Sequence, residues 1–433
     1  MHKHAYNVRL RTCSSSSSSR TEHVMIETPS PTALDRRPTH DPAARTVRLV
    51  FPLALGVLMA SRGRRLAHRD GPVAAPAPAQ ESPRVIVLVP AYREVDSLPH
   101  VLEALRGQTR PADRVIVTLD PHKESRRTAE LERIAHAAGA EVWHSVGNRH
   151  KKAGNLNGAL SRLLPDVSDQ DTILVQDADT YLDPHFIEVT RKKMGQGYGA
   201  VGGNFRGRSG GRLCGAFQRN EYARYARDTA RKNGKVLCLT GTACLFRAGA
   251  LKDVLEARQS GRLPRAEGVY DTKALTEDNE LTLALKHLHH RIVAPPRATM
   301  TTEVMETWRA LAKQRLRWKR GALENLIGYG LTRYTTEGWA RQLVAFLGAS
   351  VSTAYIGSVI WFLAASSGLR IAPFWMAFTA FYAIERAITV KSRGWRVSIA
   401  SMLVLPEWCF DLFLQGVHLH ALADTALRRD RNW

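Results

Sequence analysis

Apolar and polar positions follow two distinct rhythms between Arg84 and Lys193. Short runs rich in Val, Ile and Leu are each followed by a stretch whose apolar residues recur every three or four positions. The first kind of run predicts buried β-strands, and the second predicts amphipathic α-helices. The expected strand–helix pairs are RVIVLVP then SLPHVLEALRGQ, DRVIVTLD then SRRTAELERIAHAAG, AEVWHSV then KKAGNLNGALSRLL, and TILVQDADT then PHFIEVTRKK. Strict alternation predicts an α/β fold with a doubly wound, mostly parallel sheet.

The chain before Arg84 lacks this periodicity. Residues 1–46 contain a serine run and scattered Pro, Thr and Arg, which predict a disordered tail. Residues 47–66 hold the apolar stretch Leu49–Ala60 between arginines. That stretch is short for a membrane span, so an interfacial helix and a crossing helix both fit it. The Pro- and Ala-rich residues 67–83 predict a linker to the ordered domain.

After about residue 330 the chain becomes far more apolar. Gln342–Leu369 carries no formal charge over 28 residues, which is enough for one membrane-spanning helix. Ile371–Val390 and Val397–Ala423 are mostly apolar but contain ionisable residues, which cost free energy at membrane depth. We expect these two segments either to turn their ionisable groups inward or to lie partly at the interface. Residues 340–425 are therefore predicted to form transmembrane or interfacial helices.

Composition and charge narrow the class of protein and partner. With 433 residues, 44% hydrophobic and 24% charged, the chain is neither wholly disordered nor purely membranous. An excess of 62 Lys+Arg over 40 Asp+Glu gives a formal charge of +22, which attracts anionic substrates, lipid headgroups or nucleic acid. Since no RNP, zinc-finger or helix-turn-helix signature is present, a membrane surface is favoured and no nucleic acid is expected. Five cysteines without a CxxC pair argue against a disulfide framework.

Acidic residues stand where two predicted strands end. Asp120 closes VIVTLD, and Asp177 and Asp179 follow the apolar run TILV. Doubly wound sheets bind ligands at the carboxyl ends of their strands, so these carboxylates are well placed for a ligand. Asp177 and Asp179 are spaced to hold a divalent cation against a diphosphate, although such a triplet alone is more often a solvated turn. Asp120 alone is more often a cap before Pro121.

Three further motifs each allow a structural and a chemical interpretation. Glu277 and Asp278 open an amphipathic helix, where they either complement the helix dipole or provide a general base toward a hydroxyl. The basic run WRALAKQRLRWKRG is either a solvated face or a site for a diphosphate and a sugar ring. Lys152, at the start of the predicted helix KKAGNLN, is either a solvated terminus or a neighbour of phosphate.

The order of these motifs is more specific than any one of them. VPAYRE, VTLD, KAGNLN, QDADT, TGTACLFR, TED and QRLRW follow one another over roughly 230 residues, and a hydrophobic block comes after them. In this order they resemble family 2 glycosyltransferases with the Rossmann-like GT-A fold. The greatest similarity is to the membrane-embedded branch that contains cellulose, hyaluronan, chitin and poly-N-acetylglucosamine synthases. By this resemblance, residues 84–330 form the glycosyltransferase domain, which ends in the QxxRW helix.

The resemblance implies a role for each motif. The residues expected to bind the nucleotide sugar are Pro90, Tyr92, Glu94, Asp120, Lys152 and Asp177. Asp179, assisted by Asp177, would hold Mg²⁺ or Mn²⁺ on the diphosphate. Asp278, with Glu277 beside it, would be the general base for the acceptor hydroxyl. The residues expected to serve the acceptor and the diphosphate are Thr240, Gly241, Gln314, Arg317 and Trp318, with Arg315 at a variable position of QxxRW.

The implied activity is metal-dependent transfer of a sugar from a nucleotide sugar, a UDP-hexose or a UDP-N-acetylhexosamine. A base on one face of the anomeric carbon and charge neutralisation on the other favour in-line displacement with inversion. The acceptor is expected to be a growing β-linked polysaccharide, and single transfer to a lipid or protein acceptor is the alternative. The resemblance places such an enzyme in the cell (plasma or inner) membrane as a multi-pass protein in contact with membrane lipids, with its catalytic domain in the cytoplasm. The rival hypothesis is a basic, membrane-tethered binding protein with a degenerate transferase domain.

Overall fold

The structure is a computed structural model, and all the residues it describes belong to one compact unit, Pro52–Trp433. The described ranges are 83–120, 125–264, 267–365 and 373–431. Except for Pro83, the predicted N-terminal segments lie outside the described residues: the tail 1–46, the apolar segment 47–66 and the linker 67–83.

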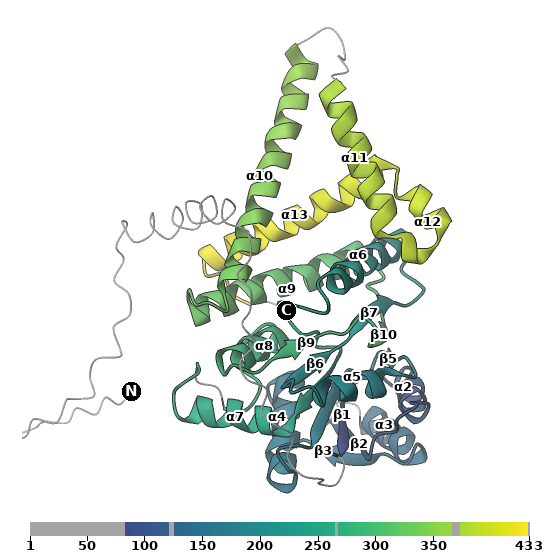
Figure 1. Cartoon of the computed structure of the whole chain (residues 1–433), viewed down its shortest axis with the longest axis vertical. Helices are drawn as coiled ribbons and strands as arrows, with labels where there is room; N and C mark the ends of the chain where they lie inside the picture. The colour runs from purple at the N-terminus through teal and green to yellow at the C-terminus, as the bar shows by residue number, and fades with distance from the viewer. Residues whose placement is uncertain (1–82, 121–124, 265–266, 366–372, 432–433) are drawn as a thin grey trace, which may run out of the picture. The chain divides into compact units, whose positions relative to one another are not determined.

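The predicted alternation of strands and helices is confirmed in the first half of the α/β region (Figure 1). Its elements are β1 (Val85–Ala91), α2 (Leu98–Arg106), β2 (Arg114–Leu119), α3 (Ser125–Ala137), β3 (Glu141–His144), α4 (Lys151–Leu163), η1 (Leu164–Asp166), β4 (Thr172–Gln176), β5 (Thr180–Leu182) and α5 (Phe186–Met194). All of β4 and nearly all of β1 are buried, because both faces of a parallel sheet are covered. Helix α2 buries Leu98, Val101 and Leu105, which share one helical face.

The second half of the α/β region supplies a return strand and the helices that complete the site. Its elements are β6 (Ala200–Gly202), β7 (Asn204–Gly207), α6 (Arg212–Arg231), β8 (Ala243–Arg247), α7 (Ala248–Gln259), α8 (Glu277–His287), β9 (Ile292–Val293), β10 (Thr299–Thr302) and α9 (Trp308–Tyr329). The main sheet has the strand order β3-β2-β1-β4-β8-β6-β9, and a smaller sheet has the order β5-β10-β7.

The sheet is mostly parallel, as predicted, with β8 as the exception. Strands β1 to β4 pair in parallel, whereas β8 runs antiparallel to both β4 and β6. Because β8 returns alongside β4, Gln176 at the end of β4 lies opposite Ala243 at the start of β8. The amide of Asp177 donates a hydrogen bond of 2.8 Å to the carbonyl of Thr242. This pairing joins Asp177–Asp179 (the DAD triplet) to Thr240–Thr242 (the TGT segment), which is distant in sequence.

Alternate residues of β1 enter two hydrophobic cores, one on each face of the sheet. Ile86 packs in a cluster with Leu156 of α4 and residues of α7 and α8. Val87 points the other way, into a cluster with Leu98 of α2 and residues of α3 and α5. The two cores fix the helices that carry the site against the strand ends.

The hydrophobic C-terminal part of the chain folds into four α-helices and a short 3-10 turn among the described residues. They are α10 (Thr336–Ala365), α11 (Pro373–Thr389), η2 (Lys391–Arg393), α12 (Trp395–Ala400) and α13 (Val404–Ala426). The predicted segment Val397–Ala423 is thus divided between α12 and α13. Helix α13 lies across α9 and α6 (Figure 1), where Phe410 stacks on Phe217 with ring centroids 4.9 Å apart and also contacts Leu311.

Arg386, Glu407 and Asp411 of these C-terminal segments turn inward, which was one of the two expected arrangements, whereas the Glu385 side chain is 42% exposed. Glu407 of α13 is 2% exposed and accepts hydrogen bonds from Asn220 Nδ2 at 2.8 Å and Arg224 Nη1 at 3.0 Å, both on α6. Asp411 pairs with Arg386 of α11. The Glu407 contacts anchor α13 to α6 of the α/β region, whereas the Asp411–Arg386 pair joins α13 to α11. A buried carboxylate requires such a counter-charge.

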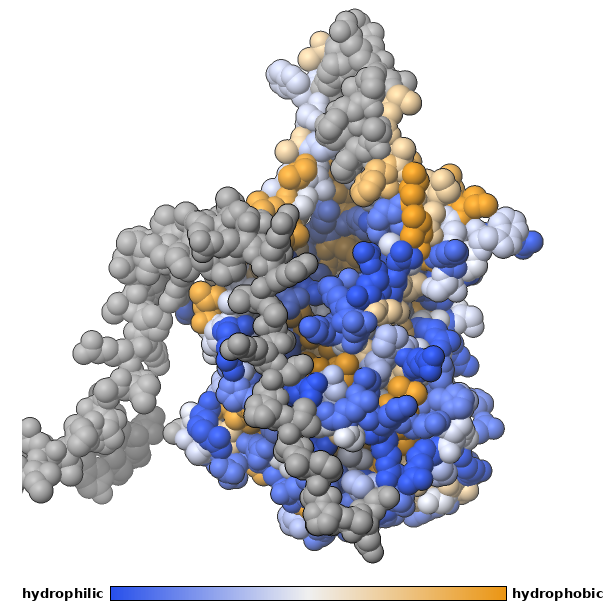
Figure 2. Space-filling model, viewed as in Figure 1, coloured by the Kyte–Doolittle hydropathy of each residue, from blue (hydrophilic) through white to orange (hydrophobic). Residues whose placement is uncertain are grey.

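Within the described ranges, none of the helices is both long enough and apolar enough to cross a membrane. The predicted transmembrane spans of residues 340–425 therefore stay a prediction. Apolar side chains are nevertheless exposed on these helices, among them Val351, Ile360 and Phe381. Figure 2 shows hydrophilic side chains over most of the visible α/β face, with hydrophobic ones gathered over the C-terminal helices.

Candidate active site

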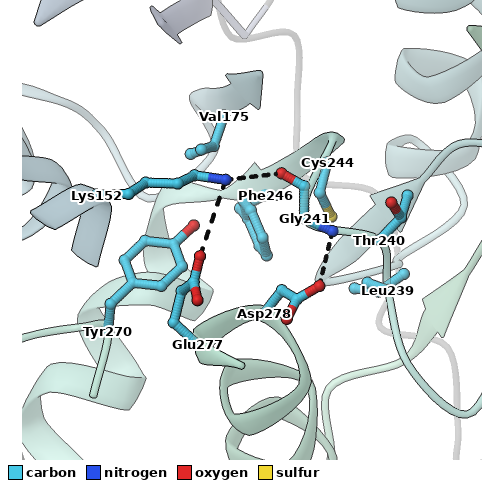
Figure 3. A pocket seen from close by; sticks show the side chains of 10 residues that line it. All are labelled: Lys152, Val175, Leu239, Thr240, Gly241, Cys244, Phe246, Tyr270, Glu277 and Asp278. Atoms are coloured by element: carbon cyan, nitrogen blue, oxygen red, sulfur yellow. Dashed lines mark hydrogen bonds and ion pairs between the residues drawn. The ribbon is translucent and has the colours of Figure 1, made fainter. Parts of the chain in front are cut away.

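Four segments meet at the carboxyl end of β4. They are the start of α4, the DAD triplet, the TGT segment before β8 and the first turn of α8. Lys152 of α4 connects them, because its ammonium group pairs with Asp177. The same group donates to the carbonyl of Gly241 at 3.0 Å and lies 3.9 Å from Glu277 Oε1, and Figure 3 draws both of these contacts. Burial opposes the charge on Lys152, but the carboxylates of Asp177 and Glu277 outweigh burial and raise its pKa.

Asp278 faces this junction from the first turn of α8. Its Oδ2 accepts a hydrogen bond from the amide of Gly241 at 2.9 Å, and its Oδ1 accepts one from the amide of Asn279 at 2.8 Å. A Cβ atom at residue 241 would lie 3.0 Å from Oδ2, so glycine allows this close approach. Burial and the neighbouring Glu277 raise the pKa of Asp278 to about 6, although Lys152 acts in the opposite direction.

A pocket at this junction is lined by both predicted and unpredicted residues (Figure 3). Five of its lining residues were predicted: Lys152, Thr240, Gly241, Glu277 and Asp278. The remaining lining residues were not predicted: Val175, Leu239, Cys244, Phe246 and Tyr270. Cys244 and Phe246 belong to the TGTACLFR motif, but neither was assigned to the site. Val175, Leu239 and Tyr270 gave no signal, because they look like ordinary core residues of β4 and the loops beside it.

A buried ion pair holds α8 in place. Arg258 of α7 and Glu280 of α8 are each 2% exposed, and they form a hydrogen bond of 2.6 Å. Tyr329 of α9 donates a second hydrogen bond of 2.6 Å to Glu280. Sequence reasoning missed both charged residues, because an arginine in a helix with other charged residues predicts a solvated side chain.

Asp179 differs from its neighbour Asp177 in having no cationic partner in the part of the chain that the structure describes. Within the described residues, Asp177 pairs with Lys152, whereas no ion pair forms at Asp179. Burial and the charge of Asp177 raise the pKa of Asp179 to about 6, so an added cation would stabilise its ionised form. No group of three or more His, Cys, Asp or Glu side chains in the described part of the chain could hold a metal ion alone. One or two carboxylates that share a cation with a diphosphate are the usual magnesium arrangement, and these two residues fit it.

The predicted nucleotide residues on β1 and β2 lie at strand ends but do not line the pocket. Glu94 turns back to accept hydrogen bonds from the amides of Tyr92 at 2.7 Å and Arg93 at 2.8 Å. Pro90 is the penultimate residue of β1. Asp120 follows β2 and accepts hydrogen bonds of 2.8 Å from Asn148 Nδ2 at both of its oxygens. These side chains lie at the same edge of the sheet as Asp177, as the parallel topology requires.

The QRLRW segment lies on α9, and its two arginines have opposite environments. Arg317 is exposed, and its charge is among the influences that lower the pKa of Asp278, opposing burial and Glu277. Arg315 is 2% exposed and pairs with Glu221 of α6 at 2.8 Å. Trp318 is half-buried beside the Arg315 guanidinium. Sequence reasoning treated Arg315 as a variable position and did not identify Glu221, which is one of the few acidic residues in a basic stretch.

Comparison with known proteins identifies the class. Residues 83–321 match the family described as Glycosyltransferase like family 2, which is more than half of the chain. The chain therefore belongs to glycosyltransferase family 2 and is a glycosyltransferase, as the order of its motifs predicted.

Curated relatives and a solved structure agree with this assignment. The chain is 26% identical over 253 residues to a poly-beta-1,6-N-acetyl-D-glucosamine synthase of Staphylococcus epidermidis, covering 57% of each chain. It is also 26% identical over 285 residues to the enzyme of that name from Staphylococcus aureus, covering 63% of this chain and 64% of the relative. The chain thus spans less than two thirds of these relatives. A mannosyltransferase from Pyrobaculum calidifontis, solved with GDP-Man and Mn²⁺, has a TM-score of 0.54 at 15% identity, covering 90% of this chain and 98% of that one. This likeness supports the predicted GT-A fold.

Proposed function

We propose that this protein is a membrane-bound, inverting glycosyltransferase that extends a β-linked polysaccharide from a nucleotide sugar. The observation that carries the proposal is the meeting of Asp278 with the Lys152–Asp177 pair across Gly241. Asp278 has a raised pKa, and among the described residues it forms no ion pair. The neighbouring strand end carries Asp179, a second carboxylate with a raised pKa and no ion pair within the same ranges. A carboxylate with a raised pKa and no counter-charge suits a general base, which is the role proposed for Asp278. A second such carboxylate suits a site that holds a cation against the leaving diphosphate, which is the role proposed for Asp179.

Asp278 is the proposed general base. Its carboxylate takes the proton of an acceptor hydroxyl, whose oxygen forms a bond to the anomeric carbon. The bond from that carbon to the diphosphate breaks on the opposite face, and the nucleoside diphosphate leaves with the electron pair. Because attack and departure occur on opposite faces, an α-linked donor gives a β-linked product. The amides of Gly241 and Asn279 orient the carboxylate and leave its remaining lone pairs for the proton.

The leaving diphosphate requires positive charge on the other side of the anomeric carbon. Mg²⁺ or Mn²⁺ held by Asp179, assisted by Asp177, would supply Lewis-acid neutralisation there. Arg317 supplies a permanent charge from α9, because it is exposed and forms no ion pair within the described residues. Lys152 is proposed to keep Asp177 ionised and to adjoin the nucleotide, and Pro90, Tyr92, Glu94 and Asp120 are proposed to bind its base and ribose.

The proposed donor is a UDP-N-acetylhexosamine, with a UDP-hexose as the second choice. The 26% identity to poly-beta-1,6-N-acetyl-D-glucosamine synthases supports this order. The proposed acceptor is the growing polymer, which Thr240, Gly241, Gln314 and Trp318 would contact. Single transfer to a lipid or protein acceptor remains the alternative, since the same site geometry serves either acceptor.

Attachment to the cell membrane is part of the proposal, with the site on the cytoplasmic side, where nucleotide sugars are made. Exposed apolar side chains on α10 and α11 support contact with lipid, and the formal charge of +22 supports attraction to anionic headgroups. Whether these helices span the membrane is decided by experiment, for example by protease accessibility in vesicles.

Nucleoside diphosphate release tests the proposal. The full chain, purified in detergent, would be incubated with UDP-N-acetylglucosamine, UDP-glucose or GDP-mannose, with Mn²⁺, Mg²⁺ or EDTA. We expect metal-dependent release from one UDP-sugar, lost in Asp278→Asn and retained in the control Asp253→Asn, an exposed residue on α7. A ladder of product masses supports polymer extension, and a single mass increment supports single transfer. No release from any donor, even with native lipids and lysate, would favour the tethered binding protein.

A further inference from the structure

The QRLRW segment contains a buried cation, Arg315, which occupies a variable position of the QxxRW motif and so has no role assigned by the motif. Arg315 is 2% exposed, although it carries a permanent charge, and Arg317 two residues further along the helix is exposed. A buried guanidinium requires a counter-charge, and Glu221 of α6 supplies it at 2.8 Å. The position of the Arg315 side chain is therefore set by α6 as well as by its own helix.

The Arg315 guanidinium contacts two other residues of the QRLRW motif, Gln314 and Trp318. Nη1 of Arg315 donates a hydrogen bond of 2.6 Å to Gln314 Oε1. The guanidinium carbon lies 4.2 Å from the ring centroid of Trp318, three residues along α9, and 5.8 Å from that of Tyr222. One charged group thus fixes the amide of Gln314 and covers part of the Trp318 ring.

Helix α6 is itself a rigid support for Glu221. The residue before Glu221, Asn220, donates to the buried Glu407 of α13 at 2.8 Å. Gln218 exchanges two hydrogen bonds of 2.9 Å with the backbone of Met305, just before α9 begins. Because α6 is tied on both sides, Glu221 holds Arg315 at a defined place.

We propose that Glu221 and Arg315 are positioning residues that orient Gln314 and Trp318 as the wall of the acceptor subsite. This inference rests on the proposed function, because it takes Gln314 and Trp318 as acceptor-binding residues. The pair touches no reacting atom and acts through its two neighbours. Arg315 is too deeply buried to be a diphosphate ligand, so its loss should affect acceptor use and leave cleavage of the donor unchanged.

A kinetic comparison tests the inference. The full chain and its Glu221→Gln and Arg315→Lys variants would be assayed with UDP-N-acetylglucosamine, with and without a β-linked N-acetylglucosamine oligosaccharide as the acceptor probe. In Glu221→Gln we expect the acceptor KM to rise about tenfold while donor hydrolysis without acceptor stays within about twofold of wild type. Arg315→Lys, which keeps the charge but loses the forked geometry, should show the same split. Equal losses of hydrolysis and transfer would overturn the inference.

A spectroscopic measurement works even if this donor is not the substrate. The difference in fluorescence between the wild type and Trp318→Phe isolates the emission of Trp318, and acrylamide quenching measures its accessibility. We expect this component to be quenched more strongly in the Glu221→Gln background, because the guanidinium that covers the ring is released. Unchanged quenching would overturn the inference, whatever the donor proves to be.

A matched control is available at the far edge of the sheet. Glu141 pairs with Arg114 at 2.8 Å, and Arg114 lies 6.0 Å from the ring centroid of Trp143. Glu141→Gln removes a more exposed Glu–Arg pair that also adjoins a tryptophan, away from the site, and should change neither the Trp318 component nor the acceptor KM. If either Glu221→Gln or Arg315→Lys fails to fold, as judged by its thermal midpoint, the other variant carries the test.

Discussion

Helix α8 carries acidic side chains in two opposite environments, one on the pocket side and one on the core side. Asp278 is half-buried at the pocket and accepts hydrogen bonds from two backbone amides, and its pKa is raised to about 6 by burial and Glu277. Glu280, two residues later, is 2% exposed and is neutralised by Arg258 and bonded to Tyr329. The comparison teaches that a fully paired carboxylate maintains the scaffold, whereas an incompletely compensated one is available for proton transfer.

The largest expected effect comes from removing the pocket-side charge. Asp278→Asn should lower kcat by about 10²–10⁴-fold, the usual contribution of a general base, because the amide cannot accept the proton. The thermal midpoint should change little, since Asp278 forms no ion pair among the described residues and loses only one of its two amide hydrogen bonds. Nucleoside diphosphate release and differential scanning fluorimetry would measure the two quantities. A large loss of stability with normal activity per folded molecule would contradict the comparison.

The core side should respond in the opposite way. Arg258→Met leaves Glu280 buried without its counter-charge, so we expect the free energy of unfolding to fall by about 3–5 kcal/mol. Denaturant titration measures this loss, and the donor KM of the remaining folded enzyme should be little changed. The control is Arg262→Met, which removes the exposed pair with Glu256 and should cost about 0–1 kcal/mol. Equal costs for both variants would show that burial does not govern these pairs.

The pH dependence of the rate sharpens the comparison further. Because the base acts when deprotonated and its pKa is raised to about 6, kcat/KM should fall about tenfold per unit below pH 6 and level off above it. A raised carboxylate pKa adds stability in acid that is lost as pH rises through 6, so this group does not cause acid unfolding. A pH–rate profile, with the folded fraction followed by circular dichroism, tests this. A flat profile from pH 5 to 8 would exclude Asp278 as the base.

The smallest expected effect concerns the close contact beneath Asp278. In Gly241→Ala the new Cβ would lie 3.0 Å from Oδ2, so the carboxylate should shift by a few tenths of an ångström and kcat should fall by about tenfold. Gly158→Ala on α4 is the control, because no atom lies within 4 Å of its added Cβ. That control should keep full activity and gain slightly in stability. Equal activity of both variants would show that the position of Asp278 tolerates the shift.

Much of the fold and part of the site could be predicted from sequence. The apolar runs of β1 and β4 predicted strands, because a strand buried on both faces is apolar at nearly every position. The helical periodicity of α2 predicted a helix, because burial of one face repeats every three or four residues. The acidic residues at strand ends were predicted to share one edge because parallel strands end together. Asp177 and Asp120 follow the ends of β4 and β2, which are both strands of the parallel part of the sheet. Lys152 pairs with Asp177 beside the pocket, whose lining includes neither Asp177 nor Asp120.

The sequence by itself therefore determined the strands and helices of the first half of the α/β region, their alternation and the family, because local periodicity and motif order are written along the chain. Only the tertiary structure decided which charges pair. Arg315 and Arg317 are the same residue type two positions apart, and helical geometry turns them to different faces of α9. On one face Arg315 forms a buried ion pair with Glu221 of α6, and on the other Arg317 is exposed. Such pairing depends on contacts between distant segments, and neither composition nor spacing records those contacts.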